Sequence, residues 1–451
     1  MTIRPARPQS CNTPVTHNSI SLRVLNKKYS IFTFNKFLTI ISLNKKAIYQ
    51  FSENTISLGA IKTIHLGLTV WLIPFLIVKV GIVNYGMYAF AMSLVLLFVN
   101  VLNYGFSLST VREIAKNKEN PVRLNTLVSE VFSVKIVLFI IEYLLFIALI
   151  MLFPSLWEQK EMYFFTSFFL IAELFSLRWF FLGMEKMKFL ALMNVGSTFM
   201  YVVLVVFFIK EPEHYVYIPL FEVVGITFIA IAAFVWVLKA YKIKLKWIGF
   251  KEVLTYLKLN FNSFINLLLP STFGTIVVFL VGVFGMPAHV SFMQIGLKIS
   301  SAFSTVNTIL TLVFYPMVNK NSKTMLPARA VLLGVGFVLS VSLYVVSDYL
   351  IVHWLLLETT EEYAIAIQIV QILSPIPFLM SVISSYGING LLTFYKDTLY
   401  SKITLISTLT TVIFIIVLQP SYPFLSGAIA LLVGRFVYAS WSFLAFHKIN
   451  K

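Results

Sequence analysis

Apolar runs of about 20 residues recur along nearly the whole chain, separated by short polar segments. A helix of this length crosses about 30 Å of hydrocarbon, so each run predicts a membrane span. The sequence therefore predicts an all-α, polytopic membrane protein with about twelve transmembrane helices. The runs cover residues 56–80, 88–110, 124–153, 162–183, 189–209 and 216–239, then 261–285, 288–317, 328–355, 364–386, 400–418 and 424–446.

Composition agrees with a bilayer as the main solvent. Of the 451 residues, 59% are hydrophobic and 12% are charged, whereas an ordinary soluble domain carries about 25% charged residues. The net charge of +17 would suggest nucleic acid in a soluble protein, but the basic residues gather in the N-terminal segment and in alternate loops, so we expect no nucleic-acid partner. The single cysteine, Cys11, excludes a disulfide framework or a thiolate metal cluster within one chain.

Residues 1–52 contain no acidic residue, and their only apolar stretch, 31–43, is too short to span a membrane. We interpret this segment as a basic, disordered cytosolic tail or as an over-called translation start. An interfacial amphipathic helix and a transit peptide are the alternatives. Its basic residues are Arg4, Arg7, Arg23, Lys27, Lys28, Lys36, Lys45 and Lys46.

The loops alternate in charge, which predicts the orientation of the spans. Because basic loops stay on the cytoplasmic side, both termini are expected in the cytoplasm, and an even number of spans agrees. The basic loops are 112–123, 185–188, 239–258, 320–329 and 447–451, and the acidic ones are 158–161, 211–213 and 358–362.

The most basic loop divides the chain into two sets of six spans. We predict a first bundle at 56–240, a basic cytoplasmic linker at 241–258 and a second bundle at 259–451. The sequence Val-Gly-Ile-Val at 80–83 recurs weakly as Val-Gly-Val-Phe at 281–284, at the end of the first span of each half. Halves with equal numbers of spans share one topology, which predicts parallel pseudo-symmetry and a substrate cavity between the bundles.

Pro74 and Pro270 interrupt the first span of each half at equivalent positions. A proline removes one helical hydrogen bond and clashes with the preceding turn, so it kinks the helix. We predict that both residues are hinges of bundles that rock against each other; the alternative is an ordinary kink, since proline is common in membrane helices.

Motifs for catalysis are missing from the sequence. It contains no phosphate-binding loop, no HExxH zinc motif and no nucleophile elbow, and no loop is large enough to hold an active site. The histidines are scattered without the spacing of metal ligands. We therefore predict that the protein is not an enzyme and has no cofactor and no metal site.

Ionisable residues inside apolar spans are the best indication of function, because each costs at least about 2.5 kcal/mol at a helix centre. Lys62 and His65 share one face of the first span, while Lys298 and Arg435 fall near the middle of the eighth and twelfth spans. We predict that these four line a cationic cavity for an anionic substrate. For Lys62, snorkelling to the headgroups is the alternative.

A second group of ionisable residues has two interpretations. Lys135, Glu142 and Glu173 lie deep in the third and fourth spans, and Asp348 lies closer to the end of the ninth. Lys135 with Glu173 or Glu142 is either an interhelical ion pair that fixes packing or part of the coupling machinery. Glu173 and Asp348 are candidate carriers of a coupling ion.

The segment around the first two spans resembles the opening of bacterial polysaccharide flippases, the Wzx or O-antigen flippase family. Its elements are Ile-Pro at 73–74, Val-Gly-Ile-Val-Asn-Tyr-Gly-Met-Tyr-Ala-Phe at 80–90, Asn-Tyr-Gly-Phe at 103–106 and Arg-Glu-Ile-Ala-Lys at 112–116. The order and spacing match the family pattern, and the twelve-span plan extends the resemblance more loosely over 56–451. In the second half the motif departs, with Pro287 where the first half has Gly86.

The resemblance implies membership of the superfamily that also holds multidrug extruders and peptidoglycan-precursor flippases. It implies that the protein moves undecaprenyl-diphosphate-linked oligosaccharide repeat units across a bacterial inner membrane by alternating access, for O-antigen or other surface polysaccharide synthesis. Its expected partners are the lipid-linked oligosaccharide, membrane lipids and a polysaccharide polymerase machinery. Cavity cations are expected to hold the diphosphate, which agrees with the cationic cavity predicted from the spans.

Two other functions stay open. A cation-coupled antiporter of the drug-extruder type shares the architecture, but it would favour acidic rather than basic residues in its cavity. A membrane enzyme, such as a polysaccharide polymerase or a lipid-dependent glycosyltransferase, would need a larger outer loop than this sequence offers.

Overall fold

The computed structural model describes residues 45–107, 109–320, 324–355, 357, 359–394 and 396–449. Side chains are described from residue 63 onward, except at 262, 316, 319, 320 and 397. The predicted tail therefore lies outside the described residues up to position 44, and so does the side chain of Lys62. Residues 52–451 form one compact unit, which contains both predicted bundles and the linker between them.

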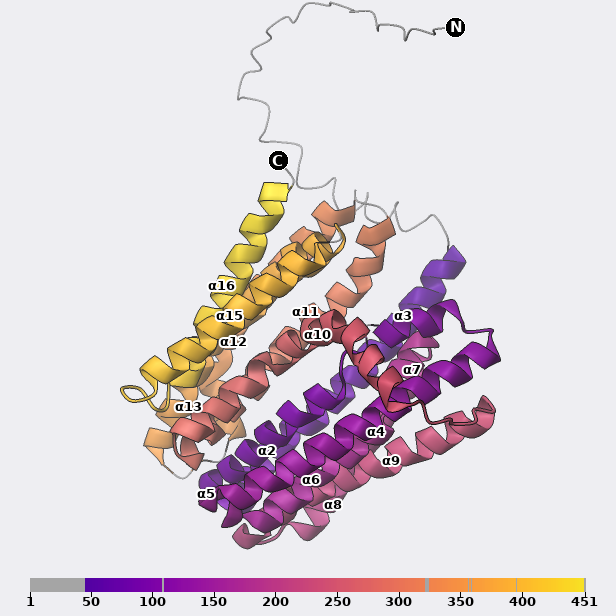
Figure 1. The fold of residues 1–451 in the computed structure, drawn as a ribbon. Coiled ribbons are helices and arrows are strands. Elements are labelled where there is room, and N and C mark those ends of the chain that lie inside the picture. The colour runs from indigo at the N-terminus through magenta and orange to yellow at the C-terminus, as the bar shows by residue number, and fades with distance from the viewer. Residues whose placement is uncertain are drawn as a thin grey trace, which may run out of the picture. The chain divides into compact units, whose positions relative to one another are not determined.

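Every regular element of the described chain is helical (Figure 1). The first half comprises α2 (Lys45–Leu102), α3 (Ser109–Lys116), α4 (Pro121–Leu152), α5 (Pro154–Trp157), α6 (Lys160–Phe175), α7 (Arg178–Gly183), α8 (Met187–Phe208), the 3₁₀-helix η1 (Pro212–Tyr217) and α9 (Ile218–Ala240). The second half comprises α10 (Phe250–Phe284), α11 (Pro287–Lys320), α12 (Met325–Trp354), α13 (Thr360–Leu373), α14 (Ile376–Val382), the π-helix η3 (Ile383–Leu392), α15 (Asp397–Leu418) and α16 (Ser426–Ile449).

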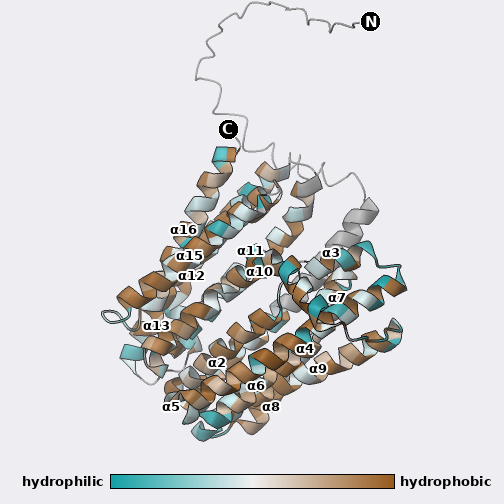
Figure 2. Ribbon diagram, in the orientation of Figure 1, coloured by the Kyte–Doolittle hydropathy of each residue, from teal (hydrophilic) through white to brown (hydrophobic). Residues whose placement is uncertain are grey.

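Eleven helical segments among the described residues are long and apolar enough to cross a membrane. Hydrophobic residues dominate their lengths, and hydrophilic residues gather at helix ends and loops (Figure 2). The first segment, Thr63–Leu102, has 40 residues and would be about 60 Å long as one helix, twice the hydrocarbon thickness. It breaks at Gly81, whose φ of 80° is open to glycine without strain.

Leu72 and Tyr88, which lie on opposite sides of Gly81, line the same cavity, so the chain folds back at the glycine. The segment therefore contains two spans, which we call the first arm (63–80) and the second arm (82–102) of α2. With this division the prediction of an all-α membrane protein with about twelve spans is confirmed.

Local sequence signals begin and break several helices. Asn120 accepts a hydrogen bond from the amide of Arg123 at 3.0 Å, and Pro121 follows as the first helical residue of α4. A capping box between Thr359 and Glu362 begins α13. The hinge candidates Pro74 and Pro270 lie inside α2 and α10 without interrupting either helix, so their hinge role stays a prediction.

The predicted linker is attached to the first half along α4. The backbone amides of Lys244, Lys246 and Ile248 donate to the side chains of residues 125, 129 and 133 on α4, at 2.6, 3.1 and 3.3 Å. Two residues of extended chain and one helical turn both advance by about 6 Å, so the two repeats stay in register. The rest of the linker forms the start of α10, where Val253 is fully buried against the first half.

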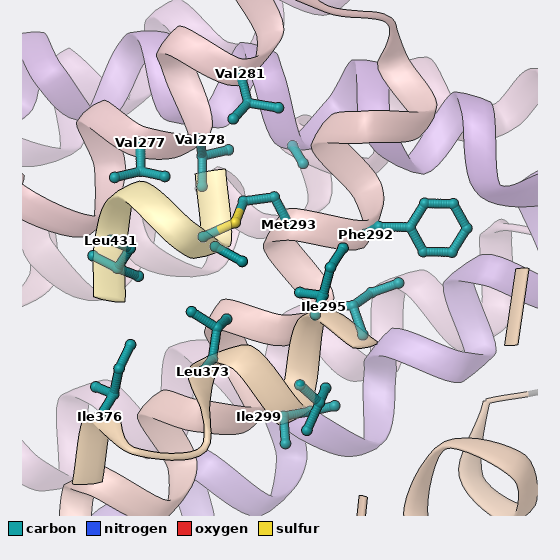
Figure 3. Packing of buried hydrophobic residues seen from close by; sticks show 14 of the residues in the cluster. Val277, Val278, Val281, Phe292, Met293, Ile295, Ile299, Leu373, Ile376 and Leu431 are labelled. Carbon is teal, nitrogen blue, oxygen red and sulfur yellow. The ribbon is translucent and has the colours of Figure 1, made fainter. Parts of the chain in front are cut away.

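Buried apolar side chains form three clusters among the described residues. Two lie within the first half and the start of α10, whereas the largest joins the second half to both arms of α2. Figure 3 shows part of this largest cluster, to which Val277 on α10, Met293 on α11 and Leu373 on α13 contribute. The two halves therefore share a packed core.

One tight contact of the halves lies at the ends of the spans that carry the acidic loops, here called the acidic end. A Cβ atom added at Gly86 would overlap the backbone carbonyl of Pro287, and the Ser291 hydroxyl donates to the carbonyl of Ile82. Beside this contact the rings of Phe90 and Phe279 stack at 5.8 Å. Only a residue without a side chain fits at position 86.

Candidate functional site

A cavity of about 360 Å³ lies between the arms of α2, α6, α8 and α9 of the first half and α11 of the second half. Its wall is mostly apolar, with polar side chains at a few points, as in most ligand pockets. The second half contributes two lining residues, Gln294 and Lys298, one turn apart on α11.

Toward the acidic end, the wall carries a tyrosine and glutamate cluster. The Tyr88 hydroxyl donates to Oε2 of Glu222 at 2.6 Å and lies 3.3 Å from the hydroxyl of Tyr201. Tyr85 stands beside Tyr88, with ring centroids 6.0 Å apart. Carboxylate and hydroxyl groups on aromatic walls suit a ligand that carries hydroxyls.

Lys298 is the cation that the second half contributes to the cavity. Its side chain is partly buried, and within the described chain its ammonium group has neither an ion pair nor a hydrogen-bond partner. It lies close enough to interact electrostatically with Glu222 and with His65. The Nδ1 atom of His65 is 2.6 Å from the hydroxyl of Thr198. A lysine without a fixed partner is free to bind an incoming anion.

Lys135 and Glu173 pair at a break in the fourth span, where Lys135 also binds free carbonyl groups. That span stops at Phe175 and resumes at Arg178, which leaves carbonyl groups without helical partners. The Lys135 ammonium group, 1% exposed, donates to the Glu173 carbonyl at 2.6 Å, to Glu173 Oε1 at 2.9 Å and to the Ser176 carbonyl at 3.1 Å. All three of its donors are therefore used inside the protein.

Other residues chosen from the sequence lie away from the cavity. Arg435 on α16 is partly buried and faces the ring of Phe273 on α10 at 4.1 Å. Asp348 is exposed on α12 and accepts a hydrogen bond from Gln371 at 3.1 Å. Glu142 is buried on α4 and does not line the cavity. The structure thus brings Lys298, His65 and Glu173 close to one cavity and leaves Arg435, Asp348 and Glu142 apart.

The tyrosine and glutamate cluster was missed from the sequence. Glu222 is visible there as an acid near a span end, and Tyr85 and Tyr88 are spaced three apart, on one helical face. Nothing in the sequence indicates that they meet, because their partners are more than 100 positions away. Within the described chain, no group of three or more His, Cys, Asp or Glu side chains could hold a metal ion.

The described residues therefore form a polytopic helical membrane fold of about twelve spans, with a mostly apolar cavity that carries a few polar side chains from both halves of the chain. Solved structures share this fold at low sequence identity. A structure of the lipid II flippase MurJ in an inward closed conformation matches with a TM-score of 0.67 and 15% identity over 88% of this chain and 87% of that one. The D35N mutant of the MATE transporter VcmN from Vibrio cholerae matches with a TM-score of 0.58 and 15% identity, over 88% and 97%.

The family described as polysaccharide biosynthesis protein matches residues 51–322, more than half of the chain, and the chain belongs to that family. A protein of Escherichia coli (strain K12) described as "Putative O-antigen transporter" is 25% identical over 419 residues, which cover 88% of this chain and 97% of that protein. The Escherichia coli protein is described as a transporter and MurJ as a flippase, which agrees with the prediction that the protein is not an enzyme.

Proposed function

We propose that this protein carries undecaprenyl-diphosphate-linked oligosaccharide repeat units across the bacterial inner membrane by alternating access, for surface polysaccharide synthesis. The observation that carries this proposal is Lys298, which faces the first half across the cavity and whose ammonium group has no fixed partner among the described residues. The family match, the O-antigen transporter of Escherichia coli and the lipid II flippase fold support it.

Different residues of the cavity wall suit different chemical groups of such a substrate. The diphosphate needs a fixed cation, for which Lys298 is available, and Arg178 lines the same cavity. Sugar hydroxyls need hydrogen-bond partners, which Glu222, Gln294 and the tyrosines supply. The polyprenyl tail is apolar and stays in lipid, so only the head group needs a path through the protein.

We place both termini in the cytoplasm, because the positive loops lie at one end of the spans. A reporter that is active only outside the cytoplasm, fused after Lys451, should stay inactive, whereas the same reporter inserted at residue 159 should be active. The exported repeat unit must next be consumed by a polymerising reaction, so polymerase machinery is the partner we propose on the outer side.

An antiporter for small cations is the second candidate, and Glu222 in the cavity is the observation that favours it. The two functions differ in which charge they need. A drug antiporter would depend on Glu222 and tolerate a neutral residue at position 298, whereas a flippase for a diphosphate would depend on the cation.

The test is complementation of a bacterium that lacks its own flippase and makes the matching glycan. Lys298→Ala should lower surface polysaccharide about ten- to hundredfold at equal membrane levels, because a hydrogen bond to a charged group contributes about 1.5–3 kcal/mol. Lys402→Ala, at an exposed lysine of α15, is the matched control and should complement like the wild type. Full activity of Lys298→Ala would contradict the cationic site, and failure of the wild type to move the lipid-linked substrate would contradict the function.

A further inference from the structure

Glu142 is a buried acid that the cavity does not explain. Its side chain is 4% exposed, and both carboxylate oxygens lack a hydrogen-bond partner within the described chain. On α4 it shares a stripe with Phe146 and Ile150, which belong to an apolar cluster with Met92 and Ala172. A carboxylate in such surroundings is strongly unfavourable unless it is neutralised.

No neighbouring cation among the described residues can neutralise Glu142. Lys135 lies two turns before it on α4, and all three ammonium donors are already bound to carbonyls and to the carboxylate of Glu173. Glu173 on α6 interacts electrostatically with Glu142, and as a like charge it disfavours the ionised form further.

The other elements packed against α4 offer no compensation either. The second arm of α2, residues 82–102, contains no Asp, Glu, Lys or Arg, and its ionisable groups are Tyr85 and Tyr88. Helix α5 carries no ionisable residue, and α6 adds Tyr163 and, at its start, Lys160 and Glu161. Helices α3 and α10 contact mainly the cluster of Leu124–Val134, at the opposite half of α4, and the charged residues of α3 there are Arg112, Glu113 and Lys116. Phe279 of α10, which packs against the cluster around Phe146, is apolar.

We propose that Glu142 is a proton-binding site through which proton movement is coupled to substrate movement. This inference rests on the proposed function. The cluster that buries Glu142 also forms part of the cavity wall, since Met92 and Ala172 line the cavity, as does Glu173. An opening of this wall gives Glu142 access to cavity water, and its closure seals the acid again.

The proton balance of the step is simple. A hydronium ion in the cavity gives its proton to a carboxylate oxygen of Glu142, forming one O–H bond and leaving neutral water. In the reverse step that O–H bond breaks, the proton goes to water and its electron pair stays on the carboxylate. Loading on the more acidic side of the membrane and release on the other would supply the energy for export.

Infrared spectroscopy of the full-length protein in lipid tests the site directly. The wild type should show the carbonyl absorption of a protonated carboxylic acid at neutral pH, and Glu142→Gln should remove it. The matched control Glu161→Gln, at an exposed glutamate of α6, should keep it. Absence of this band from the wild type would overturn the proposal, whatever the protein transports.

Vesicles with a pH gradient and an undecaprenyl-diphosphate-linked oligosaccharide as the probe test the coupling. Glu142→Gln should lose at least tenfold of the gradient-driven transport but still equilibrate the probe, and Glu142→Asp should recover part of the loss. Equal gradient dependence in wild type and Glu142→Gln would overturn the coupling alone. No probe movement by the wild type would instead overturn the flippase function, and the infrared band would still report on Glu142.

Discussion

The two bundles have the same number of predicted spans, but they contribute very unequally to the cavity. All lining residues except Gln294 and Lys298 come from the first half. The second half keeps its other deep cation, Arg435, against the ring of Phe273 inside its own packing. The two halves therefore contribute different parts of the site: the first half forms most of the wall, and the second half presents a charge to it.

The largest effect is expected in the first half, where Lys135 and Glu173 pair at the break in the fourth span. Lys135→Ala should destabilise the protein by about 3–5 kcal/mol, because it leaves the largely buried Glu173 carboxylate without its cation. Unfolding in detergent, measured beside Lys402→Ala, checks this. A loss below about 1 kcal/mol would mean that the pair contributes no more than a surface ion pair does.

The junction of the halves should give an intermediate effect. Gly86→Ala places a Cβ atom against the carbonyl of Pro287 and should cost about 1–3 kcal/mol as overpacking, with a parallel loss of transport. Gly67→Ala, in the same helix with open space around it, should be neutral or slightly stabilising. Equal thermal midpoints for the two variants would show that the halves do not touch at Gly86.

The smallest effect is expected in the second half. Arg435→Met should lower stability by about 0.5–2 kcal/mol, the range of a cation–π contact, and leave transport per folded molecule unchanged. Complementation normalised to membrane level, together with thermal unfolding, separates the two quantities. A tenfold loss of transport without a loss of stability would show that Arg435 also serves the substrate, as the sequence suggested.

The spans were predictable from the sequence because every crossing must be apolar and about 20 residues long. The rotation of each helix about its own axis was not predictable. Lys298 and Arg435 look alike in sequence, each a cation near mid-span, yet one faces the cavity and the other faces Phe273. In spans that are apolar on nearly every side, hydropathy carries little information about which face meets a neighbour.

Partners distant in sequence were hidden for the same reason. The hydrogen bond between Tyr88 and Glu222 joins the second and sixth predicted spans, and only the packing of their helices brings them together. An ion pair of Lys135 with Glu173 was among the alternatives that the sequence offered, because both residues lie deep in neighbouring spans, and the structure contains this pair. The sequence did not predict that Lys135 also satisfies the carbonyl groups at the helix break, because no residue in the sequence marks that break.

The contact between Gly86 and Pro287 brings two backbones together at one end of the spans. The hydrogen bond from Ser291 to Ile82 and the stacked rings of Phe90 and Phe279 lie beside it, so a rotation of one half against the other about this contact would keep these neighbours close. A lever about 30 Å long, the thickness of the hydrocarbon layer, converts a turn of about 20° into an opening of roughly 10 Å at its far end. The side of the membrane on which a gate opens widest would then be set by where this glycine stands.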